Sequence, residues 1–475
     1  MYDPDEAPLA AAYSDALVRR WRPFTIPGHK GTTDLVGPVV AGDVPMWPGL
    51  DTLHNSAGRL GAAQDRAAQL WGADWCRFSV GGSTHGNQTL ALAVGAPGDV
   101  VIATRAVHRS LLLGFVLAGL TPTWVEPDID PRSGLPSGIS RQALAAALAD
   151  HPAAKAVFLV EPGYVGTRSD LPELAAAAHD GGVPLIVDQA WGAHLGFHPG
   201  LPQHALAAGA DALVTSAHKA LPAYTQAALV LAKTERLDPD RLDRAFDATH
   251  TTSPSGAILA SIDAARSLLA RDGNALLGRT IRLVAAARDT LREVPGLLVL
   301  DGPPDAVDPT KLVVGLAGTG ADGMAVEDDL LQAGFPVEMA DQDTIVAVVT
   351  MADTEGPHGT VEPFVAALAT AIERHRGEPR PVRPPAWLGA GLPQVALSPR
   401  EAFFAPRETV QARAAAGRVC AELVAPYPPG IPALVPGEVV SAEVIDALRA
   451  AAASGVLVSY AADPTLSTLQ VVARP

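Results

Sequence analysis

The chain has 475 residues, of which 48% are hydrophobic, and carries a formal net charge of −16. This length exceeds what one hydrophobic core supports, so two or three domains are expected. The excess of carboxylates argues against nucleic acid or an anionic membrane surface as a partner.

The cysteine content and the N-terminal sequence indicate the cellular compartment of the protein. Only Cys76 and Cys420 are present, a pattern typical of neither a disulfide framework nor a zinc site, so we expect no bound metal and a reducing environment. The N-terminus is acidic, whereas a secretory signal would be basic. The most apolar stretch, residues 111–120, is too short to cross a bilayer. We therefore expect a cytoplasmic protein that does not enter a membrane.

The first two thirds of the chain predict an arm followed by a large α/β domain. Residues 1–60 are rich in Pro, Gly and Trp and are expected to form an N-terminal arm and loops. Over residues 61–300, short apolar runs alternate with Ala-rich stretches, which predicts a mostly parallel sheet covered by helices. The expected strands are 99–103, 156–160, 184–187 and 212–214, and the expected helices are 88–94, 141–149, 171–178 and 257–293, the last as one or two helices.

The rest of the chain predicts two smaller units. A small α/β domain is expected over 301–377. The Pro-rich stretch 378–397 is typical of a linker, and residues 398–475 should form a C-terminal domain. In the small domain we expect strands at 311–316 and 344–350 and helices at 323–332 and 361–374.

The most informative motif is Ser-Ala-His-Lys, ending at Lys219, which follows the expected strand 212–214. Asp188 ends the preceding expected strand, and ligands of such sheets bind beyond the carboxyl ends of the strands. A strand-end lysine and a strand-end carboxylate are what pyridoxal 5'-phosphate (PLP) requires. The lysine amine forms a Schiff base with the aldehyde, and the carboxylate pairs with the protonated pyridine nitrogen. Taken in isolation, the motif is more often a surface lysine in a turn.

A Gly-Ser-Thr run precedes the expected helix 88–94. Gly82 allows close backbone approach to a phosphate, and the helix N-terminus offers free N–H groups. Ser83 or Thr84 could instead serve as an ordinary helix N-cap. The run lacks the lysine of a P-loop, which disfavours a nucleotide-hydrolysing enzyme.

Three further motifs could complete a cofactor site. His108 follows the expected strand 99–103 and could stack on a cofactor ring, although a lone His there is usually a loop residue. Trp191 and His194 follow Asp188 and should lie near the pyridine. The hydroxyl cluster 251–255 could bind phosphate, or could cap the helix that begins near residue 256.

In this order, the motifs resemble those of fold-type I PLP enzymes. More closely, the chain resembles the bacterial ornithine/lysine/arginine decarboxylase family, in its short form without an N-terminal regulatory domain. The segments that carry the resemblance span nearly the whole sequence and are 24–31, 48–54, 81–87, 105–110, 216–219, 251–255, 308–311, 427–432 and 436–438.

The resemblance implies a role for each motif residue. Lys219 would bind PLP covalently, Asp188 would keep the pyridine nitrogen protonated, and His108 would stack on the ring. Family members are dimers or larger assemblies with active sites at the subunit interface. The phosphate would be held by Gly82, Ser83, Thr84, Ser216 and His218, with Thr252 or Ser253 reaching it from a second subunit.

The implied reaction is decarboxylation of lysine, arginine or ornithine to the amine, with release of CO2. His218 or Lys219 would then return a proton to the substrate carbon. Two alternatives stay open on the residues alone. The enzyme could act on another amino acid or catalyse transamination or oxidation, because a lysine and an aspartate serve all these reactions. It could also be a non-catalytic homologue that binds partners.

Departures from the family pattern affect the expected substrate pocket. Residues 161–166 replace a more polar run, Gln189 takes the place of an acidic residue, and Gly256 that of an aromatic one. These changes could reshape the pocket. Candidates for holding a basic side chain are Glu338, Asp341 and Glu422, each of which could equally be a solvated or structural carboxylate.

Overall fold

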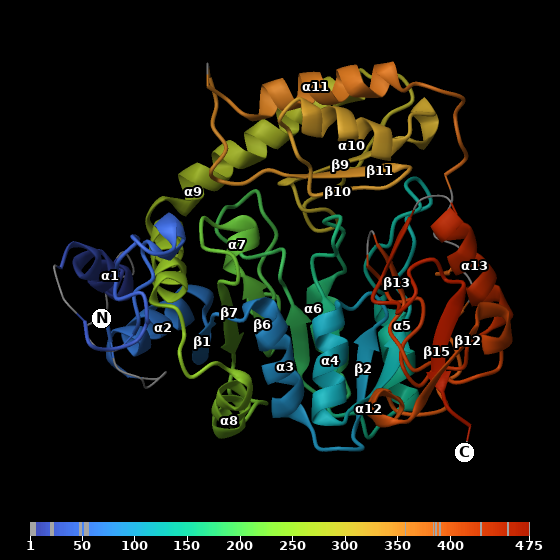
Figure 1. Ribbon diagram of the computed structural model, residues 1–475, viewed down its shortest axis with the longest axis horizontal. Helices are drawn as coiled ribbons and strands as arrows, with labels where there is room; N and C mark the ends of the chain where they lie inside the picture. The colour runs from blue at the N-terminus through green and yellow to red at the C-terminus, as the bar shows by residue number, and fades with distance from the viewer. Residues whose placement is uncertain are drawn as a thin grey trace.

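The computed structural model describes residues 6–19, 23–46, 50–51, 57–356, 358–382, 384, 387–388, 391–427, 430–453 and 456–474. A large sheet flanked by helices forms the lower part of Figure 1. A smaller sheet beneath α10 and α11 lies above it, and the C-terminal segment packs at one side. The long helix α9 (Gly256–Arg292) runs from the large sheet to the smaller one (Figure 1).

The large sheet has seven strands in the order β1-β7-β6-β5-β4-β2-β3. The pairs β2/β3, β2/β4, β4/β5 and β5/β6 are parallel, whereas β7 runs antiparallel to β1 and β6. The bounds are β1 Trp75–Ser79, β2 Val100–Thr104, β3 Thr121–Val125, β4 Val157–Val160, β5 Leu185–Asp188, β6 Ala212–Ser216 and β7 Ala228–Ala232.

Both faces of this sheet are buried, because successive side chains of a strand point to opposite faces. In β4, Val157 and Leu159 join one hydrophobic cluster and Phe158 joins the other. Helices α2 (Gly58–Trp71), α5 (Arg141–Asp150), α6 (Leu171–Asp180) and α9 contribute to the first cluster. Helices α3 (Gly82–Val94), α4 (Arg109–Ala118) and α8 (Pro239–Thr249) contribute to the second. Such two-sided burial explains why the strands are apolar throughout.

The smaller sheet is antiparallel, with strand order β10-β11-β9-β8, and packs against α9, α10 and α11. The C-terminal segment carries two two-stranded ladders, β12/β15 and β13/β14. The bounds are β8 Leu298–Val299, β9 Lys311–Gly315, α10 Gly323–Gln332, β10 Met339–Ala340, β11 Thr344–Val348, α11 Val361–Arg374, α12 Pro399–Phe404, β12 Arg407–Gln411, β13 Ala425–Tyr427, α13 Ala442–Ala453, β14 Leu457–Ser459 and β15 Thr468–Val472.

A buried ion pair joins the C-terminal segment to the large sheet. Arg105, just after β2, makes two hydrogen bonds to the carboxylate of Glu438, one of them at 3.0 Å. Its other N–H groups donate to the carbonyl oxygens of Pro432 and Ala433 at 3.0 and 3.2 Å. Both charged side chains are almost fully buried. Because these bonds satisfy the guanidinium, the pair can sit in a water-excluded interface.

The fold class predicted from the sequence is confirmed. The expected strands and helices are present, and with one exception their bounds differ by no more than two residues. The exception is α3, which begins at Gly82, six residues before the expected start at 88. Residues 257–293 form one helix rather than two. The expected domain boundaries remain predictions.

Some elements were not expected. Strands β1, β3 and β7 were missed, and the arm contains a helix, α1 (Pro8–Val18), and a 3₁₀ turn, η1 (Gly37–Val40). Within the described residues, no helix combines the length and the apolar character that spanning a bilayer demands.

We predict that Arg105→Met lowers the free energy of unfolding by about 3–5 kcal/mol, because it leaves the Glu438 carboxylate buried and unpaired. Urea denaturation measures the loss. The matched control is Arg282→Met, which breaks the solvent-exposed pair with Glu355 and should cost no more than about 1 kcal/mol. Equal losses in the two variants would contradict the prediction.

Candidate active site

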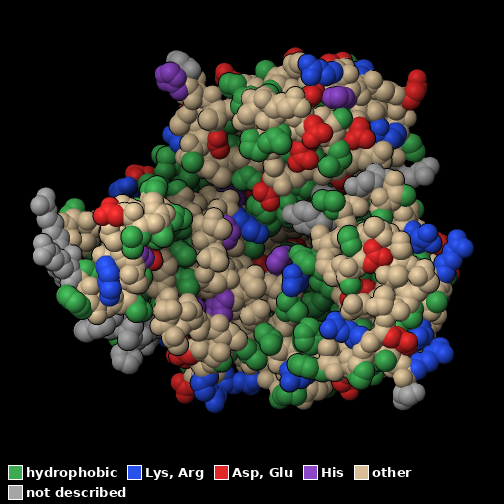
Figure 2. Space-filling view, in the orientation of Figure 1, with side chains coloured by type: hydrophobic (Ala, Val, Ile, Leu, Met, Phe, Trp, Pro, Cys, Tyr) green, Lys and Arg blue, Asp and Glu red, His purple; other side chains and the backbone are tan. Residues whose placement is uncertain are grey.

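Polar residues lie at the ends of three neighbouring strands, β4, β5 and β6, along one edge of the large sheet. In the ladder, Val160 pairs with Asp188, and Asp188 pairs with Val214. The N–H of Glu161 donates to the carbonyl of Asp188 at 3.0 Å, which extends this register one residue past β4. A cavity of about 620 Å³ opens at this edge. Figure 2 shows a hollow at the centre of the face, with cationic, acidic and His side chains around it.

Lys219 lies in the short helix α7 (Ala217–Ala220), directly after β6, and lines the cavity. Its amine lies 4.1 Å from the ring centroid of Trp191. Burial lowers the pKa of Lys219, while the charges of Asp188 and Glu338 act in the opposite direction. A desolvated lysine with a lowered pKa is a better nucleophile at neutral pH.

Asp188 ends β5 and is 3% exposed. Its Oδ2 accepts a hydrogen bond from Nδ2 of Asn87 at 2.6 Å, and its Oδ1 accepts one from the N–H of Ala190 at 3.1 Å. The amide of Asn87 also donates to the Ser110 hydroxyl at 2.8 Å, and that hydroxyl lies 2.7 Å from Nδ1 of His108. The carboxylate and His108 therefore belong to one hydrogen-bonded chain.

His108 lines the same cavity and forms the N-cap of α4, where Nδ1 accepts from the N–H of Ser110. Burial lowers the pKa of His108, which the charge of Asp188 partly offsets. A neutral imidazole with Nδ1 as the acceptor suits a ring held in a fixed orientation beside a cofactor.

The Gly-Ser-Thr run meets β6 at the N-terminus of α3. Gly82 has φ of +66°, a conformation that favours glycine. The hydroxyls of Ser83 and Ser216 lie 2.7 Å apart, and Thr84 lines the cavity with them. The alternative that Ser83 or Thr84 caps the helix is wrong, because the N-cap is Gly81, without a side-chain bond. The hydroxyls and the helix N-terminus together form an anion-binding surface.

His218 completes this surface next to Lys219. Its Nδ1 lies 3.0 Å from the carbonyl oxygen of Ala227, to which it can donate. Burial lowers the pKa of His218, and the positive charge of Lys219 adds to this effect. At neutral pH the imidazole is therefore neutral, with Nδ1 as its protonated nitrogen.

The structure does not bring every expected residue into the cavity. Thr252 and Ser253 are exposed and do not line it. His194, expected near the pyridine, instead pairs with Asp308 at 3.1 Å. Parts of two motif segments, residues 48–49 with 52–54 and residues 428–429, lie outside the described residues.

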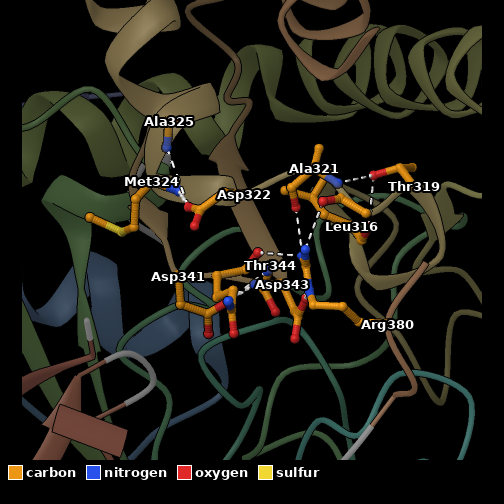
Figure 3. Close-up of polar contacts among 12 residues, drawn as sticks. Leu316, Thr319, Ala321, Asp322, Met324, Ala325, Asp341, Asp343, Thr344 and Arg380 are labelled. Carbon is orange, nitrogen blue, oxygen red and sulfur yellow. Dashed lines mark hydrogen bonds and ion pairs between the residues drawn. The ribbon is translucent and has the colours of Figure 1, made fainter. Parts of the chain in front are cut away.

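Only one of the three candidate carboxylates for a basic side chain lines the cavity. Glu338 does so, and its Oε1 accepts a hydrogen bond from the hydroxyl of Tyr164 at 3.0 Å. Asp341 instead binds the backbone N–H groups of Asp343 and Thr344 at 2.8 and 2.6 Å, as Figure 3 shows. Glu422 is buried in the C-terminal segment, where it binds backbone N–H groups.

Two departures from the family pattern do not shape the cavity. The amide of Gln189 donates to the carbonyl of Gly192 at 2.7 Å and accepts from the N–H of Ala205 at 2.7 Å. An ionised glutamate has no N–H group and could not donate to the carbonyl of Gly192. A Cβ on Gly256 would lie 2.4 Å from the carbonyl oxygen of Val44, so close packing rather than the cavity accounts for this glycine.

The third departure does shape the cavity. Glu161, just after β4, is 3% exposed. Its Oε1 accepts from the N–H of Ser169 at 2.8 Å, while Oε2 has no hydrogen-bond partner among the described residues. Burial raises the pKa of Glu161 to about 7, although the bonds from Ser169 and the charge of Arg168 oppose the rise.

Sequence reasoning assigned no role to Asn87, Tyr164 or Tyr460. Asn87 stands four residues after Ser83, and therefore on the same face of a helix. Starting that helix at residue 82 would have revealed it. Tyr460 comes from the C-terminal segment, lines the cavity and lies 4.6 Å beneath the guanidinium of Arg109. No local signal in the sequence connects it with the site.

These residues fit PLP. Among the described residues, the Lys219 amine has no hydrogen-bond partner, so it is free to react. A buried carboxylate, Asp188, stands on the neighbouring strand. The paired hydroxyls of Ser83 and Ser216 sit at a helix N-terminus, where a phosphate is favourable. The cavity of about 620 Å³ leaves room for an amino acid as well.

The sequence matches the Orn/Lys/Arg decarboxylase major domain over residues 7–311 and the C-terminal domain of the same family over residues 388–456. The chain belongs to the Orn/Lys/Arg decarboxylase family. The resemblance noted in the sequence is thereby confirmed, and so is the expectation of a PLP-dependent decarboxylase of a basic amino acid.

Relatives within the family match almost end to end. An arginine decarboxylase of Bacillus anthracis is 34% identical, covering 98% of this chain and 97% of the relative. An arginine decarboxylase of Bacillus subtilis is 33% identical, covering 98% of both.

The fold is shared with solved structures. Lysine decarboxylase A from Pseudomonas aeruginosa superposes with a TM-score of 0.81 at 21% identity, covering 98% of this chain and 80% of that chain. The constitutive lysine decarboxylase of Escherichia coli gives 0.80 at 19% identity, covering 99% of this chain and 82% of that chain. At these identities the likeness concerns the fold alone.

We predict that the contribution of Glu161 to the stability of the cofactor-free protein falls with rising pH, because Glu161 must ionise while buried. Its pKa is near 4.5 when unfolded and about 7 when folded. The folded state therefore holds the extra proton, and stability is lost as pH rises between these values, by about 3 kcal/mol in total. Glu161→Gln removes this loss.

Urea unfolding of the wild type and of Glu161→Gln from about pH 4 to about pH 8 tests this expectation. As pH rises, the unfolding free energy of Glu161→Gln should increase relative to that of the wild type. Glu362→Gln, which changes an exposed residue of α11, serves as the control and should follow the wild type. If the wild type and Glu161→Gln keep a constant difference, the expectation is wrong.

Proposed function

We propose that arginine is the substrate and agmatine the product, together with CO2. The carrying observation is the Glu338 carboxylate, which lines the same cavity as Lys219 and forms no ion pair within the described residues. Its negative charge raises the pKa of Lys219, which lines the same cavity. A carboxylate held by the Tyr164 hydroxyl can accept the N–H groups of a guanidinium. The names of the Bacillus relatives support the same choice.

We assign the cofactor contacts as follows. Lys219 would bind the PLP aldehyde, Asp188 would pair with the pyridine nitrogen, and His108 would stack on the ring. Asn87 and Ala190 hold the Asp188 carboxylate in place through its two oxygens. The phosphate would be held at the N-terminus of α3 by Gly82, Ser83, Thr84, Ser216 and His218.

When bound, PLP supplies an electron sink for the electron pair left on the substrate carbon as CO2 departs. Asp188 stabilises positive charge at the pyridine nitrogen from a fixed position, without reorganisation.

Proton return to the substrate carbon belongs to Lys219 Nζ rather than to His218. The pKa of His218 is lowered by burial, and its Nδ1 proton is directed at the carbonyl of Ala227. A neutral imidazole in that arrangement has no proton on Nε2 to give. The charges of Asp188 and Glu338 favour the protonated form of Lys219, so its Nζ would be the group that holds the proton to be returned.

We also propose a homodimer with active sites at its interface. Apolar side chains of the arm are strongly exposed, including Phe24 at 97%, Leu35 at 85% and Val39 at 82%. A second copy covering the arm would bury them. Thr252 and Ser253 are exposed and do not line the cavity of their own subunit, and they would reach the phosphate bound by the partner subunit.

A cytoplasmic location is part of the proposal. Cys76 and Cys420 are both buried free thiols, and burial raises the pKa of Cys76 above its usual range. Thiols of this kind are typical of proteins kept in a reducing compartment.

We predict that Lys219→Ala loses the visible absorbance of the lysine-bound cofactor and all CO2 release from arginine. Without the amine, no covalent link to the aldehyde can form. Absorbance spectra and CO2 measurement on protein supplied with PLP test this. Lys155→Ala, which removes an exposed lysine, should retain both signals. A Lys219→Ala variant that kept the band would refute the assignment.

We predict that Glu338→Gln raises the KM for arginine about 10- to 100-fold and changes kcat little. The variant removes a charge-assisted hydrogen bond to the substrate side chain that forms before and during the reaction. Glu362→Gln, in the same small α/β unit, is the matched control and should leave KM unchanged.

A substrate panel of arginine, lysine and ornithine, with CO2 and amine products measured, tests the substrate choice. Arginine should give the highest kcat/KM. Preference for lysine or ornithine would contradict the choice of arginine, and turnover without CO2 would contradict decarboxylation itself.

A further inference from the structure

The loop between α7 and β7 lies against the anion-binding surface at the N-terminus of α3. It turns at residues 224–227, where the N–H of Ala227 donates to the carbonyl oxygen of Tyr224 at 3.0 Å. Of the two central residues of this turn, Gln226 alone has a positive φ, +77°. A turn with a positive φ at its third position is of type II, and that position favours glycine. A glutamine therefore stands where the backbone favours glycine.

The fold does not use the side-chain amide of Gln226. The residue is exposed, and its amide makes no hydrogen bond within the described part of the chain. It lines the cavity together with Gly82, Ser83 and Thr84. Residues held in sparsely populated backbone conformations cluster at ligand sites, where the side chain has a use that offsets the strain. The amide of Gln226 is therefore available to a ligand of this cavity.

The backbone of the turn is fixed against the anion-binding surface. The carbonyl oxygen of Gln226 accepts the N–H of Gly82 at 2.8 Å, and that of Ala227 accepts the N–H of Ala217 at 3.0 Å. A Cβ on Gly82 would lie 3.9 Å from Cα of Gln226, so the two backbones are in contact. The side chain of Gln226 thus starts from a rigid turn beside the helix N-terminus.

A phosphate at this surface would depend on neutral donors. Among the described residues that line the cavity, Lys219 is the only Lys or Arg, and its amine is assigned to the aldehyde. The N–H of Gly82 is already bound by the carbonyl of Gln226. The hydroxyls of Ser83 and Ser216 lie 2.7 Å apart, so one of their two protons lies between them. A free side-chain amide offers two further N–H donors.

We propose that Gln226 is a cofactor-binding residue whose side-chain amide donates a hydrogen bond to the phosphate of PLP. The inference deepens the proposed function and rests on its placement of the phosphate at the N-terminus of α3. Lys219 and Gln226 belong to one short segment between β6 and β7. The same piece of chain would therefore hold both the aldehyde end and the phosphate end of the cofactor.

Gln226→Gly is the first test, since it removes the amide and relieves the positive φ together. The apparent Kd for PLP, from absorbance titration of the full-length protein freed of cofactor, should rise about tenfold, as expected for one lost hydrogen bond to a charged group. The cofactor-free variant should be at least as stable in urea as the wild type, because glycine adopts this φ readily.

Pyridoxal separates the phosphate contact from every other effect of the substitution. It carries the same ring and aldehyde as PLP but no phosphate, so its apparent Kd should be the same for Gln226→Gly and the wild type. The ratio of the Kd for pyridoxal to the Kd for PLP should therefore fall about tenfold in the variant. This ratio is measured without any turnover of substrate.

Gln226→Met provides the second variant, because it keeps the length of the side chain and the positive φ but lacks the amide. It should lower the ratio as Gln226→Gly does, without any gain in stability. Gln142→Met, which changes an exposed residue of α5, is the matched control and should leave the ratio at the wild-type value.

The outcomes separate the two proposals. If Lys219→Ala keeps the cofactor absorbance, the proposed function fails, whatever the Gln226 variants show. If that band is lost but Gln226→Gly keeps the wild-type ratio, the inference about Gln226 alone is overturned. A variant that changes the subunit assembly, measured by size-exclusion chromatography, at an unchanged ratio also overturns it. Should one of the two Gln226 variants not fold, the ratio of the other decides.

Discussion

The hydrogen-bonded register of β4, β5 and β6 is the constraint on which the site depends. Neighbouring strands lie about 4.8 Å apart, and the ladder sets Val160, Asp188 and Val214 side by side. The residues that follow these positions therefore share one edge, although they are far apart in the sequence. A one-residue slip of β5 would turn Asp188 toward the opposite face of the sheet. The chemistry thus depends on strand pairing before it depends on any side-chain contact.

Much of this arrangement could be predicted from the sequence. Buried parallel strands are apolar throughout, so β4, β5 and β6 stand out, and the first polar residue after each marks the ligand-binding edge. Asp188 follows from that rule alone, whereas Lys219 stands five residues after the apolar run that ends at Val214 and was singled out because it is a lysine. The family resemblance then supplied the cofactor and the reaction class, which the positions of a lysine and an aspartate cannot distinguish by themselves.

Other features depend on contacts between distant segments, which no local pattern reports. Asn87 was overlooked because the helix was expected to start six residues late, since Gly and Ser are poor helix formers in isolation. Gln189 was expected to shape the pocket, yet it closes a turn that needs one donor and one acceptor. Lys311, at the start of β9, contacts Trp191 of the large domain because α9 connects the two sheets and places the small sheet above the large one.

The buried pair of Arg105 and Glu438 has a consequence for synthesis. Chains leave the ribosome N-terminal end first, and domains fold as they emerge. The strands of the large sheet are complete once residue 232 has emerged, but the wall of the cavity that includes Ile431 and Tyr460 comes some two hundred residues later. Until then Arg105 faces water. The nascent chain therefore carries an open, unfinished catalytic cleft until the C-terminal segment, which holds both Glu438 and Tyr460, has emerged and packs against it.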